Sequence, residues 1–165
     1  MNKNVKLENE LYEPMRVWLQ EYLEDRYPSC KVVTQVTSEI NLDDALQQHD
    51  LLTDFPKIVG LPIQIDVLGI MIDNKKKTKL AFIEAKKSQL NLHNLGQLLI
   101  YCRLANPSEA FLMSSLGMGS LNKLLRNLNR LDILTFGNKS EKMIHVSTWN
   151  ILEDHPDMKT MIPSI

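Results

Sequence analysis

The sequence predicts an α/β fold, a mixed central sheet flanked by helices. Segments with apolar residues at every third or fourth position alternate with short β-branched runs, and polar turns separate them. The expected order is helix, strand, strand, strand, helix, strand, helix, strand, strand. The 165 residues fit one domain, because single domains commonly have this size. We therefore expect a single domain over 1–165, with a core at about 7–115, a C-terminal helix and strands at 119–150, and a loose tail at 151–165.

The N-terminal elements follow from local patterns. Apolar residues recur at three- and four-residue spacing from Leu7 and predict a helix. Pro14 fits best in its first turn, with Glu13 near the cap; otherwise the helix starts at Glu8 and kinks. The run 31–37 is rich in β-branched residues and predicts a strand. The segment 41–56 predicts a short acidic helix with Asn41 as its N-cap.

Two apolar runs, 63–72 and 80–87, flank the polar segment 73–79 and predict a β-hairpin. The elements expected after it are a helix over 91–105 with Leu92, Leu95, Leu99 and Cys102 on its buried face, a strand at 110–114, a helix over 121–131, and strands at 132–136 and 143–148.

Composition excludes several classes of protein. No apolar run reaches the ~18 residues of a membrane span, and the first residues do not resemble a signal peptide, so we expect a soluble, cytoplasmic protein with no membrane partner. Two cysteines cannot build a disulfide framework. The net charge of −1 does not by itself indicate a nucleic-acid-binding protein. The charges are unevenly distributed, because residues 75–87 are basic and residues 39–54 are acidic.

Three charged residues of the hairpin carry the expected chemistry. Side chains alternate along a strand, so Glu84 and Lys86 share one face. A register that pairs Asp66 with Glu84 centres the turn at Lys75, inside the polar segment. Two adjacent carboxylates in apolar strands require a compensating cation, and an Asp, a Glu and a Lys can hold Mg²⁺ and act on a phosphate. The alternative is a hairpin with solvent-facing charges.

These residues resemble the motif of the PD-(D/E)XK nuclease superfamily, which has the restriction-endonuclease-like fold. The motif maps onto Asp66 and onto Glu84-Ala85-Lys86, and the resemblance covers about 7–115. It implies an αβββαβ core and a metal-dependent nuclease that acts on DNA. Asp66, Glu84 and the Ala85 carbonyl would hold Mg²⁺, with Mn²⁺ as a substitute, and Lys86 would act on the attacking water.

Further residues match parts of that superfamily. Gln97 and Tyr101 resemble a Gln-x-x-x-Tyr element near the site, although helix solvation and ordinary packing explain them equally well. An additional acid near the metal would be Glu8, or as second choice Glu13; helix capping is the alternative for both. Lys87 could contact nucleic acid, but the strand alternation places it on the face opposite the site.

The leading hypothesis is therefore an Mg²⁺-dependent DNA endonuclease, either a restriction-type enzyme or its cleavage subunit. A junction-resolving or repair nuclease fits the same residues. The alternative is a catalytically silent nuclease-fold binding or assembly module, which the near-neutral charge and the acidic 39–54 segment favour. The lysines of 75–79 would contact the DNA backbone or form a plain turn. One site serves one strand, so we expect a homodimer or a partner subunit.

Overall fold

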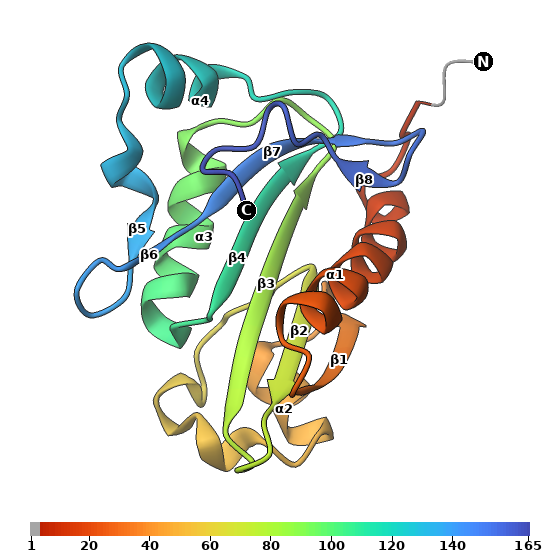
Figure 1. Cartoon of the computed structure of the whole chain (residues 1–165), viewed down its shortest axis with the longest axis vertical. Helices are drawn as coiled ribbons and strands as arrows, with labels where there is room; N and C mark the ends of the chain where they lie inside the picture. The colour runs from red at the N-terminus through yellow and green to blue at the C-terminus, as the bar shows by residue number, and fades with distance from the viewer. Residues whose placement is uncertain (1–3) are drawn as a thin grey trace.

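A computed structural model describes residues 4–165 (Figure 1). It has an α/β architecture with a mixed six-stranded sheet in the order β1-β2-β3-β4-β7-β8, and a separate pair, β5-β6. The strands are β1 (Lys31–Val36), β2 (Val67–Ile72), β3 (Thr78–Lys86), β4 (Glu109–Ser114), β5 (Thr135–Phe136), β6 (Lys142–Met143), β7 (His145–Asn150) and β8 (His155–Pro156). The helices are α1 (Tyr12–Arg26), α2 (Leu42–Gln48), α3 (Leu92–Ala105) and α4 (Ser120–Asn122), and a 3-10 turn, η1 (Glu8–Leu11), precedes α1.

The chain order explains why the sheet is mixed. β1, β2 and β3 are antiparallel neighbours. A short turn joins β2 to β3, as the predicted hairpin requires, whereas residues 37–66, which include α2, connect β1 to β2. The turn of this hairpin is closed by the Asp73 carboxylate, which accepts hydrogen bonds from the N–H groups of Lys75 and Lys77 at 2.8 and 2.9 Å. β3, β4 and β7 are parallel, with α3 as the crossover between β3 and β4.

Helices cover both faces of the sheet (Figure 1). On one face α1 packs against Ala81 and Ile83 of β3, and Gly69 of β2 lets it approach closely, since a Cβ there would lie 2.6 Å from Leu23 Cδ1. On the other face Leu95 and other residues of α3, together with α2 and α4, pack against Phe82 of β3. The alternation predicted for β3 is therefore confirmed.

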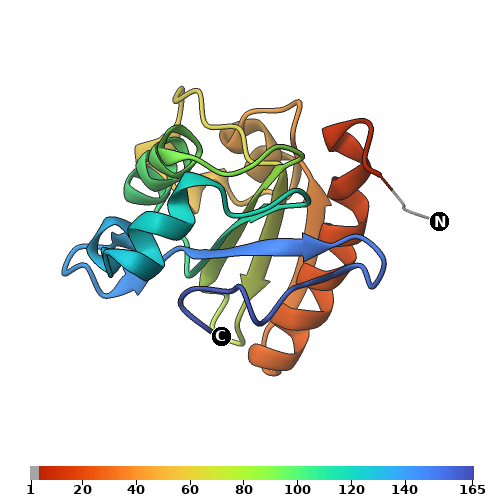
Figure 2. The ribbon, with the colours of Figure 1, turned by 90° about the horizontal axis from the view of Figure 1, so that it is seen from above.

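The C-terminal residues differ from the prediction of a loose tail. Trp149 pairs with Pro156, Val146 forms a bridge with Ile162, and Met161 is buried, so 151–165 returns along β7 (Figure 2). These contacts join residues that are separated along the chain, and no local sequence pattern predicts them.

Two element boundaries and the buried face of one helix also differ from the prediction. The strand predicted from residue 63 begins at Val67, and the helix predicted over 121–131 is a single turn of α4 followed by a π-helical turn at Lys123–Asn127. In α3 the predicted Leu92 is exposed, and Leu98 is buried instead. Within residues 4–165 no helix is long and apolar enough to span a membrane.

Candidate active site

The start of β2 and the end of β3 bring two acids together. Asp66 immediately precedes β2, and its carbonyl is held by the N–H of Thr37 at 3.0 Å. Val67 pairs with Ile83, which places Asp66 in line with Glu84, as the sequence predicted. Both side chains are buried, with Asp66 9 % and Glu84 5 % exposed. Folding has thus removed two adjacent carboxyl groups from water, which is costly unless a cation or hydrogen bonds compensate.

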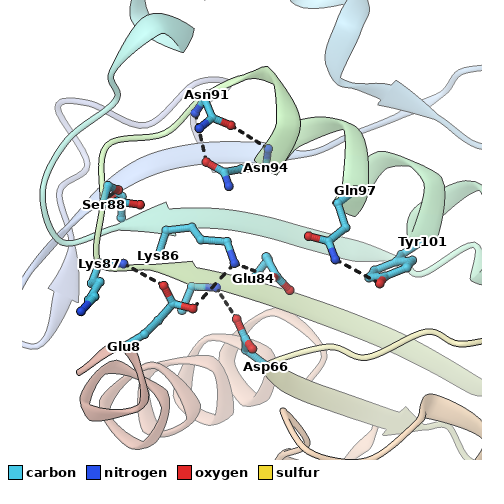
Figure 3. A network of polar contacts seen from close by, with 12 residues as sticks. Glu8, Asp66, Glu84, Lys86, Lys87, Ser88, Asn91, Asn94, Gln97 and Tyr101 are labelled. Atoms are coloured by element: carbon cyan, nitrogen blue, oxygen red, sulfur yellow. Dashed lines mark hydrogen bonds and ion pairs between the residues drawn. The ribbon is translucent and has the colours of Figure 1, made fainter.

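Compensation is incomplete in what we call the acid–lysine cluster, defined as Asp66, Glu84 and Lys86 (Figure 3). One oxygen of Asp66, Oδ2, accepts the N–H of Ala85 at 2.8 Å, and Glu84 Oε1 accepts a hydrogen bond from Lys86 Nζ at 3.0 Å. The second oxygen of Glu84, Oε2, is buried and has no hydrogen-bond partner among residues 4–165. Buried polar atoms without partners are rare in folded proteins, and Glu84 Oε2 is one of three such side-chain atoms in residues 4–165.

The electrostatics of the cluster follow from its burial. Burial and the charge of Asp66 raise the pKa of Glu84 to about 7. Burial also raises the pKa of Asp66, although the hydrogen bond from Ala85 opposes this. Burial lowers the pKa of Lys86, but the charges of Glu84, Glu8 and Asp66 outweigh it and raise that pKa overall. At neutral pH Lys86 is therefore an ammonium ion, and the Glu84 beside it is only partly ionised.

Of the two candidate additional acids, Glu8 lies at the cluster and Glu13 does not. η1 places Glu8 Oε1 3.7 Å from Lys86 Nζ, while Glu8 Oε2 accepts the N–H of Lys87 at 3.2 Å (Figure 3). Glu13 instead forms an ion pair with Arg16 at 2.6 Å, and its side chain is 64 % exposed. Glu8 of η1 therefore lies at the site, whereas Glu13 of α1 faces solvent.

The remaining predicted residues border the cluster without joining it. Gln97 Nε2 donates to Tyr101 Oη at 3.2 Å on α3, and neither side chain hydrogen-bonds to the cluster within residues 4–165. Lys87 is exposed, and its Nζ donates to the carbonyl of Lys6 at 3.0 Å. Lys87 therefore ties the N-terminal segment to the end of β3.

The lysine-rich turn lies at the far end of the hairpin. Lys77 precedes β3, whereas Glu84 lies near the end of that strand. Seven residues at about 3.3 Å each separate them by about 23 Å. One of the lysines, Lys79, places its ammonium 5.4 Å from the centre of the Tyr27 ring. These lysines are too distant to touch a phosphate at Glu84.

Sequence reasoning did not single out Tyr12, which stands beside the acids. Burial, followed by the charges of Asp66 and Glu8, raises the pKa of its hydroxyl well above the usual range. Tyr12 follows Glu8 by four residues, and this spacing places both side chains on one helical row. This four-residue spacing is the sequence feature from which Tyr12 could have been predicted as a site residue.

The oxygen donors of the cluster fit a hard divalent cation. Mg²⁺ is usually held by one or two carboxylates together with water, and Glu84 Oε2 is a buried carboxylate oxygen that lacks a partner. The N–H of Ala85 points toward Asp66, and the carbonyl of the same strand residue points to the same edge, where β2 has ended. No group of three or more His, Cys, Asp or Glu side chains in residues 4–165 is arranged for a metal, so a bound ion would rely on two carboxylates, this carbonyl and water.

Comparison of the chain with protein-family models, with curated proteins and with solved structures finds no match. The chemistry must therefore be inferred from the site itself. The acid–lysine cluster combines buried anionic oxygens, which suit a hard cation, with one ammonium ion, which suits a phosphate or a water molecule.

Proposed function

We propose that this protein is an Mg²⁺-dependent DNA endonuclease of the PD-(D/E)XK type, acting as a restriction-type enzyme or as a cleavage subunit. The observation that carries the proposal is the buried acid–lysine cluster with its unpartnered Glu84 Oε2. The order α1-β1-β2-β3-α3-β4 supports it, because it agrees with the αβββαβ core that the resemblance implies once the short α2 is set aside.

In this proposal Asp66, Glu84 and the Ala85 carbonyl hold Mg²⁺. When bound, the ion would polarise the phosphate and favour ionisation of the attacking water. Lys86 is ammonium at neutral pH, so its role is to orient that water and to offset the phosphate charge. Its hydrogen bond to Glu84, at 3.0 Å, holds the ammonium group next to a carboxylate that would bind the metal, and this position supports the role. In-line attack by that water would form a new P–O bond and break the bond to the 3′ oxygen; the proton lost by the water would pass to solvent, and the departing 3′ oxygen would take a proton from solvent.

A catalytically silent binding module is the competing function, and the near-neutral charge of the chain favours it. Such a module gains nothing from two buried acids, one of which raises the pKa of the other, because their burial lowers its stability. The cost of the cluster is therefore better explained by catalysis than by binding alone. A junction-resolving or repair nuclease would use the same cluster on another DNA structure.

Incubation with supercoiled plasmid tests this proposal. We expect the wild-type protein to nick or linearise the plasmid with Mg²⁺ or Mn²⁺, and to be inactive when a chelator removes the metal. Glu84→Gln should abolish cleavage, because it removes a charged ligand while keeping the shape of the side chain. Glu13→Gln is the matched control, since Glu13 lies outside the cluster. Equal cleavage by Glu84→Gln and wild type, or cleavage in chelator, would contradict the proposal.

A further inference from the structure

A polar hollow of about 520 Å³ opens next to the acid–lysine cluster. Its walls are η1 with the start of α1, the end of β1 with the turn that follows it, and the last residue of α2. Val36 at the end of β1 pairs with Val67, which directly follows Asp66. The hollow therefore lies at the same end of the sheet as the cluster.

Two residues of the hollow also touch the surroundings of Asp66. Tyr12 lines the hollow, and its hydroxyl stands close enough to the cluster that the charge of Asp66 adds to burial in raising the hydroxyl pKa. Thr37 lines the hollow as well, and its N–H donates to the carbonyl of Asp66 at 3.0 Å. A group seated in the hollow would therefore adjoin a carboxylate that is proposed to hold the metal.

The charges of the hollow do not suit a phosphate group. Within residues 4–165 no Lys or Arg lines it, and its charged lining residues are the acids Glu13 and Glu39. DNA phosphates are bound chiefly by Lys and Arg, and two carboxylates would repel them. The hollow thus adjoins the place where a phosphate would react but is itself unsuited to the DNA backbone.

The same lining does suit a nucleobase. It presents the carboxamides of Asn9, Gln35 and Gln48, and such groups recognise the edges of bases. Gln35 is held in place, because its Nε2 donates to Gln48 Oε1 at 3.2 Å and its Oε1 lies 2.9 Å from His49 Nε2. Gln48 uses its oxygen in this network, so its amide N–H groups can donate to a base. The ring of Tyr12 offers an aromatic surface for stacking.

We propose that the hollow receives one unpaired base of the DNA, next to the phosphate that is cut. Paired bases are read by helices or strands that project into a groove, and a concave site cannot do this. A base reaches a hollow only when it leaves the stack, and this costs least where the base is already unpaired. The inference rests on the proposed nuclease function and adds to it the structure of the preferred substrate.

Cleavage of two pools of short labelled duplexes in Mg²⁺ tests the inference. Both pools have randomised sequences, and the second carries one unpaired base at a fixed position of the labelled strand. We expect the wild type to cut the second pool at least about tenfold faster, at a phosphate next to the unpaired base, because a paired base must first be extruded. Equal rates, or cuts that ignore the unpaired base, would overturn this inference alone. Failure to cut either pool would overturn the proposed nuclease function and this inference with it.

Variants of the hollow separate base binding from a mere preference for flexible DNA. Gln48→Leu removes an amide, and Ser38→Trp fills the hollow. Each should reduce the preference for the second pool about fivefold or more, on the order of losing one base contact, while cleavage of the paired pool stays close to wild type. Gln47→Leu is the matched control, because Gln47 is exposed on the same helix and does not line the hollow.

Circular dichroism checks that each variant is folded. A folded Gln48→Leu or Ser38→Trp protein that keeps the full preference for the unpaired base would overturn the inference. The same holds if Gln47→Leu loses the preference as strongly as Gln48→Leu.

Discussion

Replacement of Glu84 by glutamine should stabilise the metal-free protein at alkaline pH. Burial, together with the charge of Asp66, raises the pKa of Glu84 from its ordinary 4.5 to about 7. Each factor of ten in proton affinity corresponds to about 1.4 kcal/mol, so ionising Glu84 in the folded state costs about 3 kcal/mol. Glutamine resembles the protonated carboxyl group and can still accept the hydrogen bond from Lys86. It therefore avoids this cost.

The pH dependence has a definite sign. Because the pKa of Glu84 is higher in the folded than in the unfolded protein, the fold favours the protonated group. The proton on Glu84 contributes to the free energy of unfolding. This contribution is fully present below pH 4.5 and is lost as the pH rises through about 7. The free energy of unfolding of Glu84→Gln should therefore match the wild type at about pH 4.5 and exceed it by up to about 3 kcal/mol at about pH 8.

Urea unfolding of both proteins across this pH range, with a chelator present, measures the difference directly. Titrating groups outside the acid–lysine cluster affect both proteins alike, so they cancel in the comparison. Glu13→Gln serves as control, because the exposed Glu13 has a lowered pKa owing to its hydrogen bond with Arg16. A difference between Glu84→Gln and wild type that stays constant from pH 4.5 to 8 would refute the idea that burial suppresses the ionisation of Glu84.

Other consequences can be measured separately. Mg²⁺ affinity should fall up to about tenfold for each pH unit below about 7, because Glu84 must lose its proton to bind the metal. Titration calorimetry across that pH range measures this affinity, and an affinity that does not change with pH would contradict the prediction. Lys86→Ala should lower the turnover number and preserve Mn²⁺ affinity at about pH 8, whereas Lys87→Ala should change turnover little; equal losses of plasmid cleavage would refute these roles. Gly69→Ala should lower the free energy of unfolding by about 1–3 kcal/mol, because the added Cβ would clash with Leu23. Gly96→Ala should not lower it, because a Cβ there meets nothing within 4 Å. Urea unfolding that shows Gly96→Ala to be the more destabilised variant would contradict this account of how α1 packs on β2.

The arrangement of Asp66, Glu84 and Lys86 was predictable because local patterns determine it. Strand alternation put Glu84 and Lys86 on one face, and the polar turn fixed the hairpin register that aligned Asp66 with Glu84. The structure separates the two candidates for an additional acid, because Glu8 lies near Lys86 while Glu13 pairs with Arg16 outside the cluster.

Features that depend on distant contacts were not predictable. That Glu84 Oε2 is buried and lacks a hydrogen-bond partner within residues 4–165 depends on how distant parts of the chain pack together. The C-terminal tail is anchored by the bridge between Val146 and Ile162, which leaves no periodic pattern. In α3 the leucines occur on several sides of a helix whose only charged residue is Arg103, so spacing alone could not show that Leu92 is exposed and Leu98 buried.

Titration calorimetry with Mn²⁺ tests the central claim most directly, since that claim assigns a divalent metal to Asp66 and Glu84. At about pH 8, where Glu84 is largely ionised, the wild type and Glu13→Ala should bind Mn²⁺ with the same affinity. Asp66→Ala and Glu84→Ala should each bind at least about tenfold more weakly while remaining folded, because each removes a carboxylate ligand. Equal Mn²⁺ binding by all four proteins would contradict the account.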